Sequence, residues 1–193
     1  ALDSLTLSNN ITEIAKNTFE GCKSLRHIVI PKRITKISNN AFSSCESLDS
    51  IEINEGLAII GKGAFKDCKR LRYINLPQSL TTLEEAAFED CESLQSISVP
   101  SKIKILNKSL FYSCKKLTDL QLPDGLKEIT QDAFKGCESL EKISIPLSVS
   151  LINKNAFSDC VSLTTILWNS CVYKDIKKKE DAPFSLIAEQ ITA

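Results

Sequence analysis

The chain has one histidine, six glycines and no methionine, and the scarcity of histidine and glycine limits its chemistry. A cysteine or serine nucleophile commonly takes a histidine as its base, and His27 is the only histidine present. The glycines are scattered rather than grouped into a phosphate-binding loop (Gly21, Gly56, Gly61, Gly63, Gly125 and Gly136). We therefore expect neither an enzyme nor a bound cofactor.

The sequence also lacks an excess of one charge and a long hydrophobic run. Lys and Arg together number 24, as do Asp and Glu, so the formal net charge is zero. This balance implies no strongly basic or acidic partner. No apolar stretch is long enough to span a bilayer, so we expect no membrane insertion.

What the sequence does contain is a 23-residue repeat without insertions or deletions. Seven cysteines recur at this step: Cys22, Cys45, Cys68, Cys91, Cys114, Cys137 and Cys160. A phenylalanine precedes each by three residues: Phe19, Phe42, Phe65, Phe88, Phe111, Phe134 and Phe157. Such a period is typical of a solenoid, in which each repeat buries its apolar side only by stacking on its neighbours.

One segment of each repeat alternates with the period of a β-strand. In Leu25-Arg26-His27-Ile28-Val29-Ile30, the two isoleucines fall on one side, and His27 and Val29 fall on the other. Proline, which has no amide hydrogen for a sheet, ends this segment in five repeats (Pro31, Pro77, Pro100, Pro123 and Pro146). The pattern predicts one short strand in each turn.

A second segment of each repeat has helical spacing. Ala41, Phe42, Cys45 and Leu48 recur at spacings of 1, 4 and 7, and Asn40 before them suits a helix start. We therefore predict a short helical or 3₁₀ segment in each turn, and an α/β solenoid overall. Eight strands about 4.8 Å apart would form a parallel sheet roughly 34 Å across. Because helices are wider than strands, we expect a curved array with the sheet on the concave face and the helical segments on the convex face.

The repeat A-F-x-x-C-x-S-L-x-x-I-x-I-P resembles the BspA-like subfamily of leucine-rich repeats. Ala-Phe and Cys-x-Ser-Leu are its most specific marks, and serine precedes the leucine in five repeats (Ser24, Ser47, Ser93, Ser139 and Ser162). The resemblance covers all eight turns and departs mildly, as where Ser8, Asn54 and Asn169 replace proline. It implies a non-enzymatic protein that is secreted by, or displayed on, bacteria or mucosal protozoa. Several such proteins act as adhesins toward host extracellular-matrix proteins or other microbes.

The periodicity predicts one array over residues 1–169, with eight strand-bearing turns, and a C-terminal tail over residues 170–193. In the tail, Phe184, Ile187, Ala188 and Ile191 share one helical face, so a short capping helix near 184–191 and a disordered tail are both open. The chain starts at Ala1 inside a repeat, without methionine or signal peptide. We therefore expect a processed or trimmed fragment whose first strand edge is covered by an upstream turn or a partner.

The cysteines admit three interpretations, of which core packing is favoured. A disulfide framework needs facing Cβ vectors, whereas stacked columns point the same way. A metal site needs closely spaced ligands, and no two cysteines lie closer than 11 residues. We predict small apolar core residues beneath the phenylalanines and no metal site, with a Cys160 to Cys171 disulfide as a minor alternative.

Function is expected in the columns that core packing leaves free, on the concave face. The candidate ligand-binding residues are Arg26, His27, Asp49, Ser50, Glu52, Arg72, Tyr73, Asn75, Gln95 and Asp119. A nucleic-acid groove needs a positive excess and stacking aromatics. These columns are slightly acidic and carry Tyr73 as their only aromatic, so we expect a protein partner and no nucleic acid.

The favoured function is an adhesin-like, cell-surface or secreted module that recognises host matrix or other proteins. Two alternatives stay open. The array could be a rigid spacer with a solvated face, or an intracellular scaffold, for which only the free thiols argue. A second surface, the apolar loop column Ile59, Ile105 and Leu151, lies in alternate turns, so we expect no continuous patch there.

Overall fold

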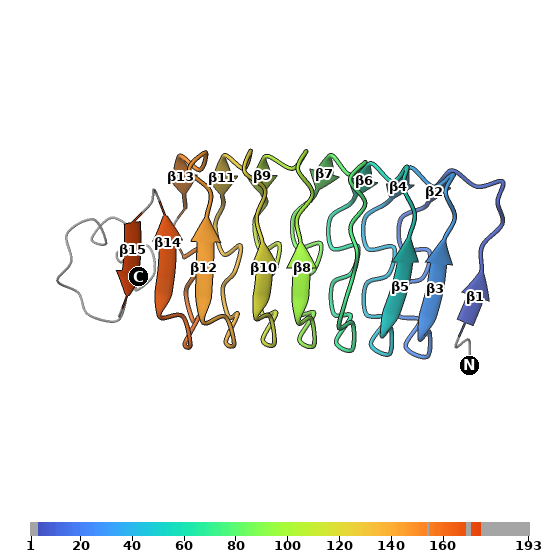
Figure 1. The fold of residues 1–193 in the computed structure, drawn as a ribbon. Coiled ribbons are helices and arrows are strands. Elements are labelled where there is room, and N and C mark those ends of the chain that lie inside the picture. Colours follow the sequence, from blue (N-terminus) through green and yellow to red (C-terminus); the bar gives the residue numbers. More distant parts are fainter. Residues whose placement is uncertain (1–3, 154, 169–170, 175–193) are drawn as a thin grey trace.

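Each repeat folds into one turn of a parallel β-solenoid, and the turns stack side by side (Figure 1). The computed structural model describes residues 4–153, 155–168 and 171–174. A row of longer strands, the long row, consists of β1 (Ser4–Thr6), β3 (His27–Ile30), β5 (Ser50–Ile53), β8 (Ser96–Ser98), β10 (Asp119–Gln121), β12 (Lys142–Ile145) and β14 (Thr165–Trp168). The short row consists of β2 (Glu13–Ile14), β4 (Lys36–Ile37), β6 (Ile59–Ile60), β7 (Thr82–Leu83), β9 (Ile105–Leu106), β11 (Glu128–Ile129) and β13 (Leu151–Ile152).

Where neighbouring strands pair, the register follows the repeat residue by residue, and the pairing divides the long row into three sheets: β1-β3-β5, β8-β10 and a third that contains β12 and β14. Ser4 pairs with His27, and His27 pairs with Ser50, all in parallel register. Tyr73 has no strand of its own but takes the same place through a parallel bridge to Ser96. The seven long-row strands and Tyr73 give eight positions, which delimit about seven complete turns. The prediction of parallel, in-register strands is therefore confirmed.

One further strand extends the long row at its C-terminal end and runs in the opposite direction. β15 (Cys171–Lys174) pairs antiparallel with β14, placing Ile166 opposite Tyr173. The predicted helix near residues 184–191 lies outside the described residues. The boundary between residues 169 and 170 remains a prediction.

The predicted helical segment is wrong: no described turn contains a helix. Two residues of each turn, placed two before and two after the phenylalanine, have left-handed backbone. The first column is Asn17, Asn40, Gly63, Ala86, Ser109, Asp132 and Asn155, with φ between 54° and 61°. The second column is Gly21, Ser44, Asp67, Asp90, Ser113, Gly136 and Asp159, with φ between 55° and 74°. An α-helix needs φ of about −63° at every residue. The two left-handed residues of each turn, four positions apart, therefore prevent a helix between them.

On this helix-free side, backbone hydrogen bonds to the next turn alternate with bonds inside the same turn. Phe42 N donates to Ala64 O of the next turn at 2.8 Å, and Ser43 N donates within its own turn to Asn40 O at 3.1 Å. Ser44 N again reaches across, to Lys66 O at 2.7 Å. Two consecutive tight turns therefore bury the residues at spacings of 1, 4 and 7 that a helix would bury. Their hydrogen bonds also link neighbouring repeats.

The missing helices remove the physical reason for the expected curvature. Curvature was predicted because a helical side would be wider than the strand side, and both sides are extended or tightly turned in the described repeats. None of the described segments forms a helix with the length and apolarity that a membrane span requires.

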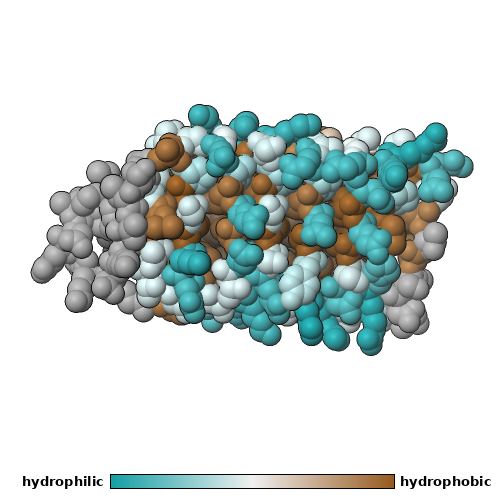
Figure 2. Space-filling view, in the orientation of Figure 1, coloured by the Kyte–Doolittle hydropathy of each residue, from teal (hydrophilic) through white to brown (hydrophobic). Residues whose placement is uncertain are grey.

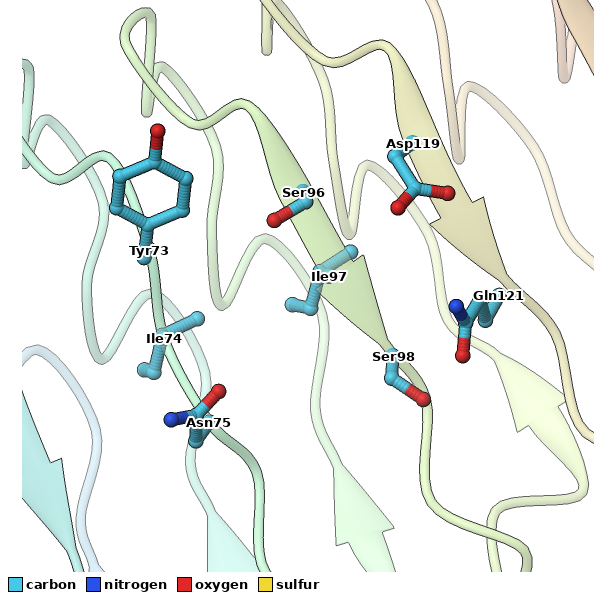
Figure 3. A pocket seen from close by; sticks show the side chains of 8 residues that line it. All are labelled: Tyr73, Ile74, Asn75, Ser96, Ile97, Ser98, Asp119 and Gln121. Carbon is cyan, nitrogen blue, oxygen red and sulfur yellow. The ribbon is translucent and has the colours of Figure 1, made fainter.

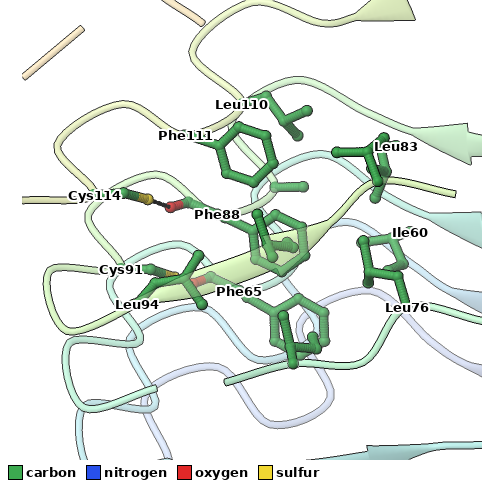
Figure 4. Packing of buried hydrophobic residues seen from close by; sticks show 14 of the residues in the cluster. Ile60, Phe65, Leu76, Leu83, Phe88, Cys91, Leu94, Leu110, Phe111 and Cys114 are labelled. Carbon is green, nitrogen blue, oxygen red and sulfur yellow. Dashed lines mark hydrogen bonds between the residues drawn. The ribbon is translucent and has the colours of Figure 1, made fainter. Parts of the chain in front are cut away.

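The core is built from columns of identical or similar apolar residues, among them an unbroken phenylalanine column (Figure 4). From Phe19 to Phe157 the rings stack on one another with centroids 5.1 to 5.7 Å apart and planes inclined by 2° to 16°. Rings at such separations stabilise each other beyond the area they bury. A phenylalanine in the middle of the stack is thus held from both sides.

The cysteines line the same core as free thiols. Each of six donates a hydrogen bond of 3.1 to 3.3 Å to a phenylalanine carbonyl of the preceding repeat (Cys45, Cys68, Cys91, Cys114, Cys137 and Cys160). These six are buried, so the core-packing prediction is confirmed for them, and Cys22 is half-buried. The alternative disulfide between Cys160 and Cys171 is wrong, because Cys160 is a free thiol bonded to Phe134 O.

A column of alternating charge runs along one edge of the stack. It consists of Lys23, Glu46, Lys69, Glu92, Lys115 and Glu138, each directly after a cysteine. Within it, Lys23 Nζ lies 2.8 Å from Glu46 Oε1, and Lys115 Nζ lies 3.3 Å from Glu92 Oε1. Neighbouring turns in register thus meet with opposite charges, whereas a slipped register would oppose charges at random.

Candidate functional site

The outward-facing residues of the long row form one continuous surface, which we call the long-strand face. It is the surface that the sequence assigns to the concave face. Along β3, Ile28 and Ile30 are buried while Val29 is exposed and His27 is half-buried. Figure 2 shows this face, with hydrophilic side chains lying over a lengthwise band of hydrophobic residues. The predicted division between core and free columns is therefore confirmed in the described turns.

Four of the candidate residues lie together on the first described turns of this face. His27 Nδ1 is 2.8 Å from Ser50 Oγ, which lies 3.2 Å from Asp49 Oδ1. His27 Nε2 is 4.0 Å from Glu52 Oε1. The contacts of His27 with Ser50 and Glu52 connect neighbouring turns, so the His27 side chain is held in place by the turn beside it.

A second group lies further along the face. Tyr73 is 55% exposed, and its hydroxyl donates to Gln95 Oε1 at 2.5 Å. Asn75 and Asp119 are exposed on either side of β8. Arg26 and Arg72, both exposed, stand just before the strand positions of their turns, and neither takes part in an ion pair among the described residues.

Three of these candidates, Tyr73, Asn75 and Asp119, border a shallow hollow of about 370 Å³ in the long-strand face (Figure 3). The hollow is lined by Tyr73, Ile74, Asn75, Ser96, Ile97, Ser98, Asp119 and Gln121. Ser96 and Ser98 occupy its middle, on β8, with longer side chains on the turns before and after. The hollow therefore exists because one turn carries two small residues between larger neighbours.

The candidate set from the sequence omitted Ser96, Ser98 and Gln121, although they line this hollow. A signal was nevertheless available in the columns, because Ser96 lies between Tyr73 and Asp119, and Ser98 between Asn75 and Gln121. A small residue flanked by large ones at a step of 23 indicates a depression in an in-register sheet.

Another hollow, of about 410 Å³, lies near the N-terminal end of the same face. It is lined by Leu5, Leu7, Asn9, His27, Val29, Pro31, Lys32 and Asn54. Its surroundings are more apolar than those of the Tyr73 hollow. Of the candidate residues, His27 alone lines it.

The apolar loop column lies on the short row instead. Ile105 is 42% exposed and Leu151 is 48% exposed, whereas Ile59 is half-buried. Thr82 in β7 pairs with Ile59, and Glu128 in β11 pairs with both Ile105 and Leu151. The expectation that these residues form no continuous patch is therefore confirmed.

Metal binding and cysteine reactivity depend on how the described side chains are grouped and buried. No group of three or more His, Cys, Asp or Glu side chains could hold a metal ion in the part of the chain that the structure describes. Burial, followed by the neighbouring Cys22, raises the pKa of Cys45 from 9.0 to about 12. Since the thiolate is the reactive form of cysteine, burial of this kind suppresses its nucleophilicity.

A family model for the BspA type leucine rich repeat region matches residues 1–118 and 104–180, with six copies. The chain belongs to the BspA-type leucine-rich repeat family. This confirms the resemblance carried by the Ala-Phe and Cys-x-Ser-Leu marks. Leucine-rich repeat proteins are normally non-enzymatic protein-interaction modules, and nothing in the family assignment indicates catalysis.

Solved bacterial structures share the fold of this BspA-type chain. A leucine rich cell surface protein from Faecalibacterium prausnitzii is 30% identical over 87% of this chain and 48% of its own, with a TM-score of 0.80. A leucine-rich repeat protein from Bacteroides ovatus is 26% identical over 88% of this chain and 46% of its own, with a TM-score of 0.83. One from T. pallidum is 29% identical over 83% and 78%, with a TM-score of 0.76.

This BspA-type chain spans about half the length of the first two of these structures. No curated protein is similar enough to count as a match.

Proposed function

We propose that this chain is a non-enzymatic protein-binding module whose partner docks on the long-strand face. The observation that carries the proposal is the contrast between columns. The core columns repeat Phe, Cys, Leu and Ile from turn to turn, whereas the outward columns of the same strands change their residue from each turn to the next. Side chains that vary on a regular scaffold can specify a partner without altering the fold.

The chemistry of the long-strand face suits a protein better than a nucleic acid. Arg26 and Arg72 stand among Asp49, Glu52 and Asp119, so charges of both signs are interspersed. Arginine and tyrosine are the residues that most often anchor protein interfaces. The ten candidate residues are accordingly our proposed contact set.

We further propose that the module is displayed on the cell surface or secreted, and acts as an adhesin toward host matrix or other proteins. Support comes from the family and from the F. prausnitzii relative, which is described as a cell surface protein. The free thiols do not distinguish the intracellular alternative from an extracellular location. Six of them are buried and bonded to carbonyls, so they would stay reduced and unreactive in either compartment.

Affinity capture from host-cell extract and immobilised matrix proteins tests the proposal. The array should retain one or more proteins that the double variant Arg72→Glu with Tyr73→Ala fails to retain. A matched control on the short-row side is Lys127→Glu with Leu151→Ala, because it also reverses one exposed cation and trims one exposed large side chain.

The outcomes separate the competing functions. Loss of capture with the long-strand variant but not with the control supports the proposal. Equal capture by all three proteins would show that binding occurs elsewhere. If nothing is captured by any of them, the rigid spacer is favoured.

A further inference from the structure

We propose that the hollow at Tyr73, Ser96 and Asp119, here called the Tyr73–Asp119 hollow, receives an arginine side chain of the protein partner. The inference rests on the proposed function and deepens it, because it states what the partner must present. It concerns one hollow of the long-strand face, so the face can bind a protein even if this inference fails.

The shape of the hollow follows from register. Tyr73 bridges to Ser96, and Ser96 pairs with Asp119, so three successive turns bring these residues into one row. A second row, two residues further along, contains Asn75, Ser98 and Gln121. Two strand spacings separate the outer columns by about 10 Å. The two serines between them leave an open slot across the middle turn.

Asp119 supplies the only carboxylate that lines this slot, and no lysine, arginine or histidine lines it. Its side chain is exposed and takes part in no ion pair or side-chain hydrogen bond among those of the described residues. Figure 3 shows its carboxylate at the side of the hollow opposite Tyr73, toward Ser96. The amides of Asn75 and Gln121 and the serine hydroxyls supply further oxygen acceptors nearby. A ligand group with several N–H donors and a positive charge fits this set.

The remainder of the slot suits an apolar stem. Ile74 and Ile97, 4% and 3% exposed, form its floor, and the Tyr73 ring borders the end away from Asp119. The Tyr73 ring is held in place by its hydroxyl's bond to Gln95 Oε1. Arginine and lysine side chains lay their methylene stems on such surfaces while the charged head reaches a polar partner. The stem would cross the serines and the head group would meet Asp119.

Arginine fits better than lysine because its planar guanidinium donates two parallel hydrogen bonds to one carboxylate. A neutral sugar could use the hydroxyls and amides but would leave the Asp119 charge uncompensated. Two cations stand beside the lining residues in the sequence or the column, Arg72 before Tyr73 and Lys142 one turn after Asp119, and neither lines the hollow.

The test is an NMR titration of the whole ¹⁵N-labelled chain with acetyl-Gly-Arg-Gly-amide. The matched probes contain citrulline, which is neutral and nearly isosteric with arginine, or lysine; methyl glucoside and methyl galactoside represent a sugar. We expect amide shifts confined to residues 73–75, 96–98 and 119–121. The arginine peptide should bind at least about fivefold more tightly than the citrulline peptide, because only the former makes a charged bidentate pair.

Two variants locate the effect. Asp119→Asn keeps the shape of an exposed side chain and should remove most of the preference for arginine over citrulline. Asp124→Asn also removes an exposed carboxylate, outside the hollow, and should leave the preference unchanged. Circular dichroism of both variants checks that the fold is retained.

The inference is overturned if arginine and citrulline peptides bind equally, if no peptide produces shifts, or if Asp119→Asn and Asp124→Asn behave alike. Binding of a methyl glycoside in preference to the peptides would also overturn it and assign the hollow to a glycan. The proposed function is judged separately by capture. Partner capture that depends on the long-strand face but not on Asp119 would refute this inference alone.

Discussion

Replacing Phe88 by alanine should break the solenoid at its middle. Phe88 is fully buried, and its ring stacks on Phe65 at 5.5 Å and on Phe111 at 5.7 Å. Removing a buried phenylalanine side chain costs about 3 to 5 kcal/mol, and loss of two aromatic neighbours places Phe88 at the upper end. Since each repeat is stabilised only by its neighbours, the damage weakens the interfaces on both sides.

Phe19 provides the internal comparison. It is 8% exposed and stacks on Phe42 alone, at 5.1 Å, among the described rings. Phe19→Ala therefore removes one stacked pair at the end of the column, and we expect a loss of about 2 to 3 kcal/mol. The difference between the two variants measures how far stability depends on position in the array.

Urea unfolding followed by two probes makes the prediction measurable. Far-ultraviolet circular dichroism reports on the whole array, and the single tryptophan, Trp168, reports on its C-terminal end. For the unmodified chain and Phe19→Ala we expect coincident transitions. For Phe88→Ala we expect them to separate, because the halves of the array become weakly coupled. Equal losses in the two variants, or a loss below about 1 kcal/mol at Phe88, would refute the argument.

Three further predictions concern thiols, backbone and charge. At pH 8, native Cys45 should react with iodoacetamide at least about a thousandfold more slowly than in urea, because its pKa is raised from 9.0 to about 12. Gly63→Ala should destabilise the fold by at least about 1 kcal/mol and Ala86→Gly should stabilise it by about 0.5 to 1, because both residues are left-handed. Asp90→Asn should stabilise the fold at pH 7, because burial and the charges of Asp67 and Glu89 raise the Asp90 pKa.

Each of these has a distinct control. Peptide mass spectrometry assigns the labelled thiols, and rapid native labelling of Cys45 would contradict the first prediction. Melting temperatures that move the same way in Gly63→Ala and Ala86→Gly would contradict the second. For Asp90, the raised folded pKa means that the destabilisation is present above that pKa and disappears as pH falls through it toward 3.8. A stabilisation by Asp90→Asn that is independent of pH between 7 and about 3 would therefore contradict the third.

The sequence predicted which residues form the core, but it predicted the wrong backbone conformation for the segment around each phenylalanine. The sequence correctly predicts burial of Ala41, Phe42, Cys45 and Leu48, but the helix that their spacing predicts is absent from the described turns. Periodicity specifies which side chains face inward, and two tight turns bury the same residues as one helical turn. Asn40, interpreted as a helix start, instead occupies the left-handed position that interrupts the helix. Asn, Asp and Gly recurring in these two columns were the available sign.

The sequence predicted which residues share the long-strand face, but not the shape of that surface. Columns at a step of 23 correctly placed Tyr73, Ser96 and Asp119 in one row, because the strand register equals the repeat. The small residues Ser96 and Ser98 between larger neighbours indicate a depression, but its full lining depends on how side chains of three turns share space. The bond from Tyr73 to Gln95 is likewise a matter of side-chain conformation.

The sequence alone thus determined the family, the turn-by-turn stacking and the division between core and surface. Each of these follows from local periodicity repeated without interruption, which leaves one register in which every apolar column is buried. Only the tertiary structure decided that the described segments around the phenylalanines form no helix, that Cys160 remains a free thiol, and that the long-strand face is hollowed beside Tyr73. These depend on backbone dihedral angles and on contacts between turns, and a pattern of residue types does not fix either.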